Sequence, residues 1–85
     1  MDEITIFLSY RLMKAKEKQF LKAFSVKMRI KRYSLNLSQL ELAEKVDCSL
    51  NALGRIERAQ ADPSLTMVFR IALALDLSIK DLMPD

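Results

Sequence analysis

The sequence predicts an all-α protein with a single domain, and three observations support this. The 85 residues include only one glycine and two prolines, so few positions interrupt a helix. Leucine, alanine, lysine and glutamate, which favour helices, are plentiful. Alternation of apolar and polar residues with a period of two, which would indicate strands, does not persist anywhere. An apolar content of 51% supplies a core for one domain of this length.

Residues 1–23 form an N-terminal extension that we expect to be helical, because apolar residues recur in it at helical spacing. A first stripe comprises Ile4, Phe7, Leu8, Leu12 and Ala15, and a rotated stripe begins with Phe20, Leu21, Phe24 and Met28. Three arrangements are open: one long helix whose apolar face drifts, two helices meeting near residues 16–18, or a short strand over residues 4–8. No glycine or proline marks a break.

Three further helices are expected over residues 24–33, 38–46 and 49–58. Ser38 and Ser49 are good N-caps for the second and third of these. Glu41 stands three residues after Ser38, which is the spacing of a capping box. The predicted core residues of these two helices are Leu42, Ala43, Val46, Leu53 and Ile56.

The C-terminal part is expected to hold a loop and two helices. Residues 59–63 form the loop, because Pro63 disfavours a helical conformation in the residue before it. Serines precede a helix over residues 65–75 and a short helix over residues 79–83, which Pro84 ends. The predicted apolar face of the longer helix comprises Leu65, Val68, Phe69, Ala72 and Leu75.

The net charge of +3 hides a division between the two halves of the chain. Residues 1–36 carry nine basic and three acidic residues, a net +6, whereas residues 37–85 carry five basic and eight acidic residues, a net −3. A polyanionic partner should therefore be attracted first to the N-terminal half.

Several functional classes are excluded by composition. The chain has no histidine and a single cysteine, Cys48, so a structural zinc site and an internal disulfide are not expected. A lone thiol without a histidine base is a poor nucleophile, and no glycine-rich phosphate loop occurs. We therefore expect no enzyme activity, no catalytic residue, no metal and no cofactor. The acidic N-terminus and the lack of a long apolar run predict a soluble cytoplasmic protein without a membrane partner.

The central stretch has the spacing of a helix-turn-helix. Counting from Gln39 as the first position, Ala43 is fifth, and a small residue there lets the second helix cross closely. Asp47 is ninth, at the corner, and aspartate tolerates a positive φ better than most residues do. Leu53 and Ile56, at positions fifteen and eighteen, can face the first helix.

These residues resemble the phage repressor/Cro-like helix-turn-helix family, also called the XRE family. The resemblance covers about 60 of the 85 residues and implies a compact five-helix, lambda-repressor-like domain over residues 24–85. The matching residues include Phe24, Arg29, Arg32, Leu37, Ser38, Gln39, Leu42, Ala43, Ser49, Glu57, Pro63, Ser64, Leu75, Ser78 and Leu82. The pattern has glycine at three places where this chain has Asp47, Ala59 and Asp76.

The resemblance implies a set of DNA-contacting residues. Base contacts in the major groove fall to Leu50, Asn51, Gly54 and Arg55. Phosphate contacts fall to Ser38, Gln39, Ser49 and Arg58. An amide at residue 51 suits adenine N6 and N7, and a guanidinium at residue 55 suits guanine O6 and N7. The resemblance also implies a structural ion pair between Arg32 and Glu57, which would hold the third helix against the first.

Simpler explanations exist for each of these residues. Asn51 can be a solvated helix residue, and Arg55 can pair with Glu41 or remain exposed. Gly54 can be tolerated at a cost of ~1 kcal/mol, and Gln39 can cap a helix without touching DNA. The extension can simply pack on its own domain.

The function expected from the sequence is a sequence-specific, double-stranded DNA-binding transcription regulator. It would act as a homodimer on a palindromic operator with half-sites about one helical turn apart. The loop after the third helix carries no basic residue, so we expect modest affinity per subunit and a strong need for dimerisation. The alternative is a protein-interaction module, or an antitoxin-like protein that binds a partner through residues 1–23.

Overall fold

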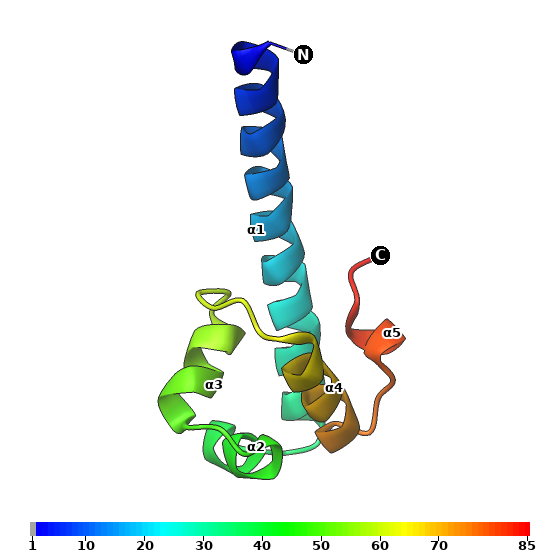
Figure 1. The fold of residues 1–85 in the computed structure, drawn as a ribbon. Coiled ribbons are helices and arrows are strands. Elements are labelled where there is room, and N and C mark those ends of the chain that lie inside the picture. Colours follow the sequence, from blue (N-terminus) through cyan, green and yellow to red (C-terminus); the bar gives the residue numbers. More distant parts are fainter. Residues whose placement is uncertain (1) are drawn as a thin grey trace.

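The computed structural model describes residues 2–85, which contain five α-helices and no strand. The helices are α1 (Glu3–Ser34), α2 (Gln39–Val46), α3 (Leu50–Glu57), α4 (Leu65–Ala74) and α5 (Ile79–Leu82). Figure 1 shows α1 running out of a small bundle that its C-terminal end forms with the other helices. The predicted all-α fold is confirmed. Within residues 2–85, no helix has both the length and the hydropathy that crossing a bilayer requires.

The extension and the first helix of the bundle form one continuous helix. Asp2 caps its N-terminus, where the carboxylate accepts a hydrogen bond from the Thr5 amide at 2.7 Å. The 32 residues of α1 span about 48 Å at 1.5 Å per residue, which accounts for the longest dimension of the molecule, 50 Å. The strand over residues 4–8 and the break near residues 16–18 are both wrong, because nothing in this stretch interrupts helical hydrogen bonding.

The core lies between the C-terminal third of α1 and the four short helices. Phe24 and Met28 of α1 are buried against residues from α2, α3, α4 and α5. At the C-terminus, Lys27 of α1 donates a hydrogen bond from Nζ to the carbonyl oxygen of Met83 at 2.9 Å. The buried apolar residues are Phe24, Met28, Leu42, Ala43, Val46, Leu53, Ile56, Val68, Ile71, Ala72, Leu75 and Leu82.

The predicted apolar face of α4 is partly wrong. Leu65 and Phe69 are 74% and 52% exposed, whereas Ile71 is completely buried. The residues that are buried, Val68, Ile71, Ala72 and Leu75, recur at helical spacing and form one face. Because α4 carries apolar residues on nearly every side, the sequence pattern did not distinguish the core face from the exposed one.

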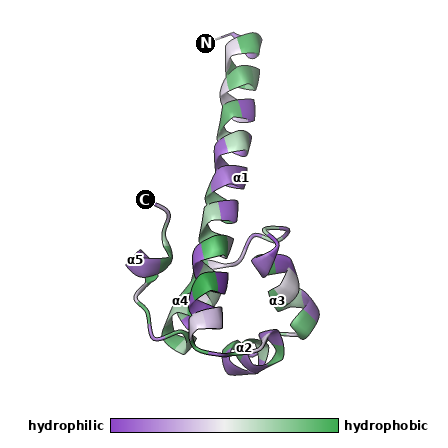
Figure 2. Ribbon diagram, turned by 180° about the vertical axis from the view of Figure 1, so that it is seen from behind, coloured by the Kyte–Doolittle hydropathy of each residue, from purple (hydrophilic) through white to green (hydrophobic). Residues whose placement is uncertain are grey.

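The N-terminal part of α1 does not pack on the rest of the chain. Every residue from 2 to 20, a segment that we call the arm, is exposed. Figure 2 shows apolar residues distributed along this arm, well beyond the bundle. The explanation that the extension packs on its own domain is therefore wrong for residues 2–20.

Four helices end with the same backbone conformation. The chain turns through the left-handed region, with φ between 56 and 59°, at Asn36, Asp47, Ala59 and Asp76. The next backbone N–H then donates to the carbonyl oxygen five residues earlier, at 2.8 to 3.2 Å. This bond is the main feature of a Schellman motif, which usually has glycine at the turn. Asparagine and aspartate tolerate this conformation, but alanine does not gain the same local hydrogen bonding, so Ala59 is the most strained of the four.

We predict that Ala59→Gly stabilises the fold by about 0.5–1 kcal/mol. Relief of the left-handed penalty, about 1–2 kcal/mol, exceeds the extra entropy that glycine has in the unfolded chain. Chemical denaturation followed by circular dichroism measures this change. Asp47→Gly is the control and should gain less, because aspartate already tolerates the turn. An equal or larger gain for Asp47→Gly would contradict the argument.

Candidate nucleic-acid interface

Local hydrogen bonds cap the start of α2 and the start of α3, on either side of the corner at Asp47. Ser38 accepts a hydrogen bond from the Glu41 amide at 3.0 Å, and the Glu41 carboxylate accepts one from the Ser38 amide at 3.0 Å. The hydrogen bond from the Ser38 amide lowers the pKa of the Glu41 carboxyl. Asp47 turns the chain, and Ser49 caps α3 by accepting from the Ala52 amide at 3.0 Å. Ala43, which is buried, leaves space for α3 to cross α2 closely.

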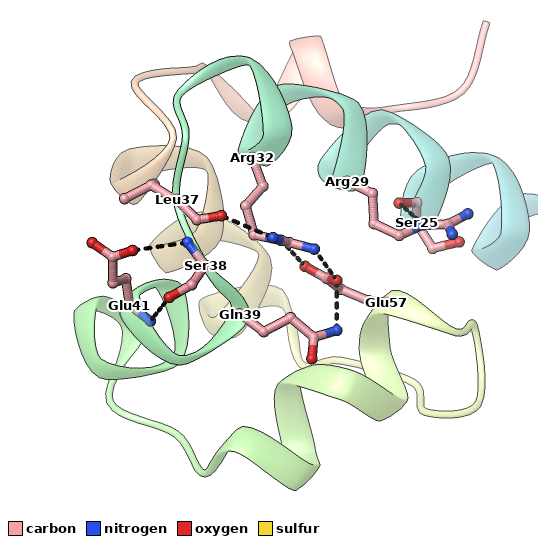
Figure 3. Close-up of polar contacts among 8 residues, drawn as sticks. All are labelled: Ser25, Arg29, Arg32, Leu37, Ser38, Gln39, Glu41 and Glu57. Atoms are coloured by element: carbon pink, nitrogen blue, oxygen red, sulfur yellow. Dashed lines mark hydrogen bonds and ion pairs between the residues drawn. The ribbon is translucent and has the colours of Figure 1, made fainter.

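A buried ion pair fixes α3 against α1. Arg32 donates from Nε to Glu57 Oε2 at 2.6 Å and from Nη2 to Oε1 at 2.9 Å. The two residues are only 5% and 1% exposed. Figure 3 shows the guanidinium lying between Glu57 and the backbone of Leu37, whose carbonyl oxygen accepts from Nη1 at 2.8 Å. The hydrogen bonds to Glu57 raise the pKa of Arg32, which stays charged.

Gln39 joins this buried pair. Its Nε2 donates to Glu57 Oε1 at 2.9 Å, so one carboxylate links side chains from α1, α2 and α3 (Figure 3). Gln39 is half-buried. Its amide therefore has a structural role in the free protein, and a phosphate would be left with the second N–H of Nε2 or with the backbone N–H groups near the start of α2.

The side of α3 opposite the ion pair is exposed. Asn51 and Arg55 lie on this side and are accessible. Leu50 is also exposed, because it is the first residue of α3, although it lies on the same side of the helix as Glu57. Arg55 donates from Nη2 to the carbonyl oxygen of Gln60 at 3.1 Å and not to Glu41. A guanidinium has five N–H donors, so this single bond leaves most of them for an external partner.

Gly54 is not accessible, in contrast to the other three predicted base contacts. It is buried, and a Cβ built on it would lie 3.0 Å from Nη1 of Arg58. The Arg58 side chain covers Gly54 and donates from Nε to Gln60 Oε1 at 3.0 Å. A base could reach Gly54 only after Arg58 moved, so the glycine makes space for Arg58 in the free protein.

The remaining phosphate candidates lie at helix N-termini. Ser38 and Ser49 are exposed, and each hydroxyl already accepts one backbone hydrogen bond. Their own hydroxyl protons remain available to donate outward. The backbone N–H of Ser38 is occupied by Glu41, so only its hydroxyl can serve a phosphate.

Two cations of α1, Lys22 and Arg29, lie near Arg58. Lys22, Arg29 and Arg58 line one hollow of about 360 Å³ between α1 and the C-terminal end of α3. The excess positive charge of residues 1–36 indicated that α1 could attract a polyanion. Only the structure shows which of its cations lie beside α3.

Cys48 lies at the corner, half-buried against the core. Burial and the neighbouring Asp47 charge raise the pKa of its thiol. A raised pKa disfavours the thiolate, which is the reactive form. The geometry therefore gives Cys48 a packing role.

A family profile described as helix-turn-helix, HTH_3, matches residues 27–82, about two thirds of the chain. The chain belongs to this helix-turn-helix family. The resemblance to the XRE family that the sequence indicated is confirmed. No curated protein sequence matches the chain significantly.

Solved structures show the same HTH_3 fold. The restriction-modification controller protein C.AhdI from Aeromonas hydrophila is 32% identical, with a TM-score of 0.72 over 74% of this chain and 96% of that one. The clp gene regulator ClgR from Corynebacterium glutamicum is 26% identical, with a TM-score of 0.71 over 73% of this chain and 66% of that one. The first is described as a controller protein and the second as a gene regulator.

Some of the similar structures belong to an enzyme. Hydroxypropylphosphonic acid epoxidase from S. wedmorenis is 24% identical, with a TM-score of 0.73, and the match covers 79% of this chain but only 36% of that one. A likeness at this identity shows the fold alone, since one fold serves many functions. The HTH_3 profile and the regulator relatives together support a DNA-binding transcription regulator.

We predict that Glu57→Ala destabilises the HTH_3 domain by about 3–5 kcal/mol, because it leaves the Arg32 guanidinium buried without its partner. The double variant Arg32→Met/Glu57→Leu should lose less, since it removes both charges. Urea unfolding followed by circular dichroism measures both. If the double variant were the less stable of the two, the unpaired charge would not be the cause.

We predict that Gly54→Ala leaves the fold intact and stabilises it by up to ~1 kcal/mol, because alanine is the better helix former. The new methyl group meets only the flexible end of Arg58, which can move away. Thermal unfolding measures the change. A loss of more than 1 kcal/mol would show that Arg58 cannot leave its place over Gly54.

Proposed function

We propose that this HTH_3 protein is a sequence-specific, double-stranded DNA-binding regulator that acts as a homodimer on a palindromic operator. One observation carries the proposal: α3 is fixed on its inner side by the Arg32–Glu57 pair and exposes Asn51 and Arg55 on its outer side. A helix held in this way presents its outer side chains in a defined orientation, as reading of base edges requires. The chain would act by binding and not by catalysis.

The exposed residues of α3 have the chemistry of base recognition. The Asn51 amide can donate to N7 and accept from N6 of one adenine, and the free donors of Arg55 can bind O6 and N7 of a guanine. Leu50 can contact the methyl group of thymine but forms no hydrogen bond. Gly54 is left out of this set, because Arg58 covers it.

Backbone phosphates would be bound at two places. The Ser38 and Ser49 hydroxyls and the N-terminus of α2 would hold one phosphate region, where the helix dipole favours an anion. Arg58, with Lys22 and Arg29, would hold the other. Cations from α1 thereby replace the basic residues that the loop after α3 lacks, and the acidic balance of residues 37–85 no longer argues against DNA.

The exposed arm supports a second candidate, in which the chain binds a protein partner and does not bind DNA. Retention of random genomic fragments on the immobilised protein distinguishes the two. Binding at ~50 mM salt that weakens strongly at ~200 mM supports the regulator, because phosphate contacts release counterions. No retention at the lower salt supports the interaction module.

We predict that Asn51→Ala and Arg55→Ala each weaken binding to the selected operator by about 10- to 100-fold, the loss expected for one bidentate base contact. Binding to unrelated DNA should change little. Fluorescence anisotropy with the selected and a scrambled duplex measures both affinities. Equal losses on the two duplexes would mean that these residues do not read sequence.

We predict a different result for Arg58→Gln. This variant should weaken binding to all sequences alike and reduce the slope of log affinity against log salt by about one, because one phosphate contact is lost. Anisotropy titrations at several salt concentrations provide the slope. An unchanged slope would remove Arg58 from the phosphate-binding set.

A further inference from the structure

The arm carries a second apolar stripe that continues the core-facing side of α1. Spacings of four and three residues alternate along it through Ile6, Tyr10, Met13, Glu17 and Phe20, and the next position is the buried Phe24. This is the repeat by which one helix packs along another. We call residues 6, 10, 13, 17 and 20 the seam.

The seam is large enough to form a specific interface. Its four apolar residues and the neighbouring Phe7 are each 46 to 58% exposed. Side chains of this size present roughly 150–250 Å² when free, so two copies could bury about 1,000 Å². That area is near the lower end of specific interfaces. Each copy contributes about 500 Å², the size of the largest apolar patch on many monomeric proteins, and such patches are often functional.

We propose that the seam binds the seam of a second copy of this chain, with the two arms antiparallel and Met13 on the two-fold axis. The proposal rests on the homodimer proposed above and supplies its contact surface. With this register, Ile6 of each copy faces Phe20 of the other, and Tyr10 faces Glu17. A hollow of about 430 Å³ lined by Met13, Phe20, Leu21 and Asp62, among others, lies where the other Ile6 packs.

Charge selects the antiparallel orientation. The tip of the arm carries Asp2 and Glu3 and no base, whereas residues 11–23 carry five bases and one acid. With Met13 on the two-fold axis, each acidic tip lies opposite residues 23 and 24 of the other copy, at the C-terminal end of its basic segment. A parallel pair would bring tip to tip and Glu17 to Glu17, and like charges facing each other are destabilising. In the antiparallel register the Glu17 carboxylate faces the Tyr10 hydroxyl, which can donate to it.

The antiparallel arms also determine how far apart the DNA-binding surfaces lie. The end of α1 near residue 34 is 21 residues from Met13, so two such ends are about 60 Å apart at 1.5 Å per residue. Figure 1 places the α2–α3 corner beside this end of α1. Two helical turns of DNA measure roughly 70 Å. The inferred dimer therefore favours half-sites two turns apart, in place of the single turn expected from the sequence.

Sedimentation of the free protein at about 100 µM tests for the dimer in the absence of DNA. A dimer whose dissociation constant is micromolar is populated at this concentration. Met13→Glu should give a monomer. Leu12→Glu is the matched control, because Leu12 and Met13 are both 58% exposed but Leu12 lies outside the seam; this variant should remain a dimer. Circular dichroism confirms that both variants are folded. A monomeric parent protein, or an equal response of the two variants, would overturn the proposal.

Disulfide trapping tests the orientation. In a Cys48→Ser background, Ile6→Cys and Phe20→Cys are oxidised separately and after mixing. The antiparallel register predicts a disulfide between the two different variants in the mixture and little cross-linking of either one alone. Rapid cross-linking of Ile6→Cys alone would show a parallel pair and overturn the register.

The dimer and the DNA-binding function can fail separately. If the parent protein dimerises but retains no DNA, the proposed function fails and the seam stands. If Met13→Glu and the parent bind a two-half-site duplex with equal affinity, the seam fails and base reading by α3 stands. Duplexes with half-sites one and two turns apart complete the test, and the inferred dimer should bind the second more tightly.

Discussion

The Glu57 carboxylate is the group on which the arrangement of this HTH_3 domain depends. It accepts hydrogen bonds from Arg32 of α1 and Gln39 of α2, while its own backbone belongs to α3. Three helices that share no backbone hydrogen bonds are thereby joined at one buried point. Since a buried charge is tolerated only when it is paired, any rotation of α3 that separated these groups would be strongly unfavourable. The orientation of the exposed side of α3 follows from this constraint.

The same pair connects α3 to the arm. Arg32 lies in the last turn of α1, and the arm is the first part of that same uninterrupted helix. A continuous helix transmits orientation along its length without a hinge. A partner that fixed the arm would therefore also fix the direction of α3, and the proposed dimer contact and the proposed base contacts would be geometrically coupled although they lie far apart.

Features encoded by short stretches of sequence could be predicted. Serine caps at residues 38, 49 and 64, the Ser38–Glu41 capping box and the turn at Asp47 each depend on a few consecutive residues, and all are present. The length of α1 could not be decided, because helical spacing is the same for one helix or two. The face of α4 was misassigned, because apolar residues surround it. Two contacts could not be predicted: the Arg58 side chain over Gly54 and the hydrogen bond from Gln39 to Glu57. Each depends on side chains that the turn and the helix crossing bring together.

The two proposed surfaces can be occupied at the same time, because they use different sides of α1. Lys22 and Arg29 are seven residues apart and so lie on one side of the helix, next to Arg58. The seam lies well away from them around the helix axis, since at 100° per residue Lys22 is rotated about 160° from Phe20. Phosphates bound beside α3 would therefore not compete with a second arm. The division of charge along the chain then has two proposed consequences. Lys22 and Arg29 would face DNA on one side of α1, and the basic segment of residues 11–23 would lie along the other copy's arm, with the acidic tip of that arm opposite its C-terminal end.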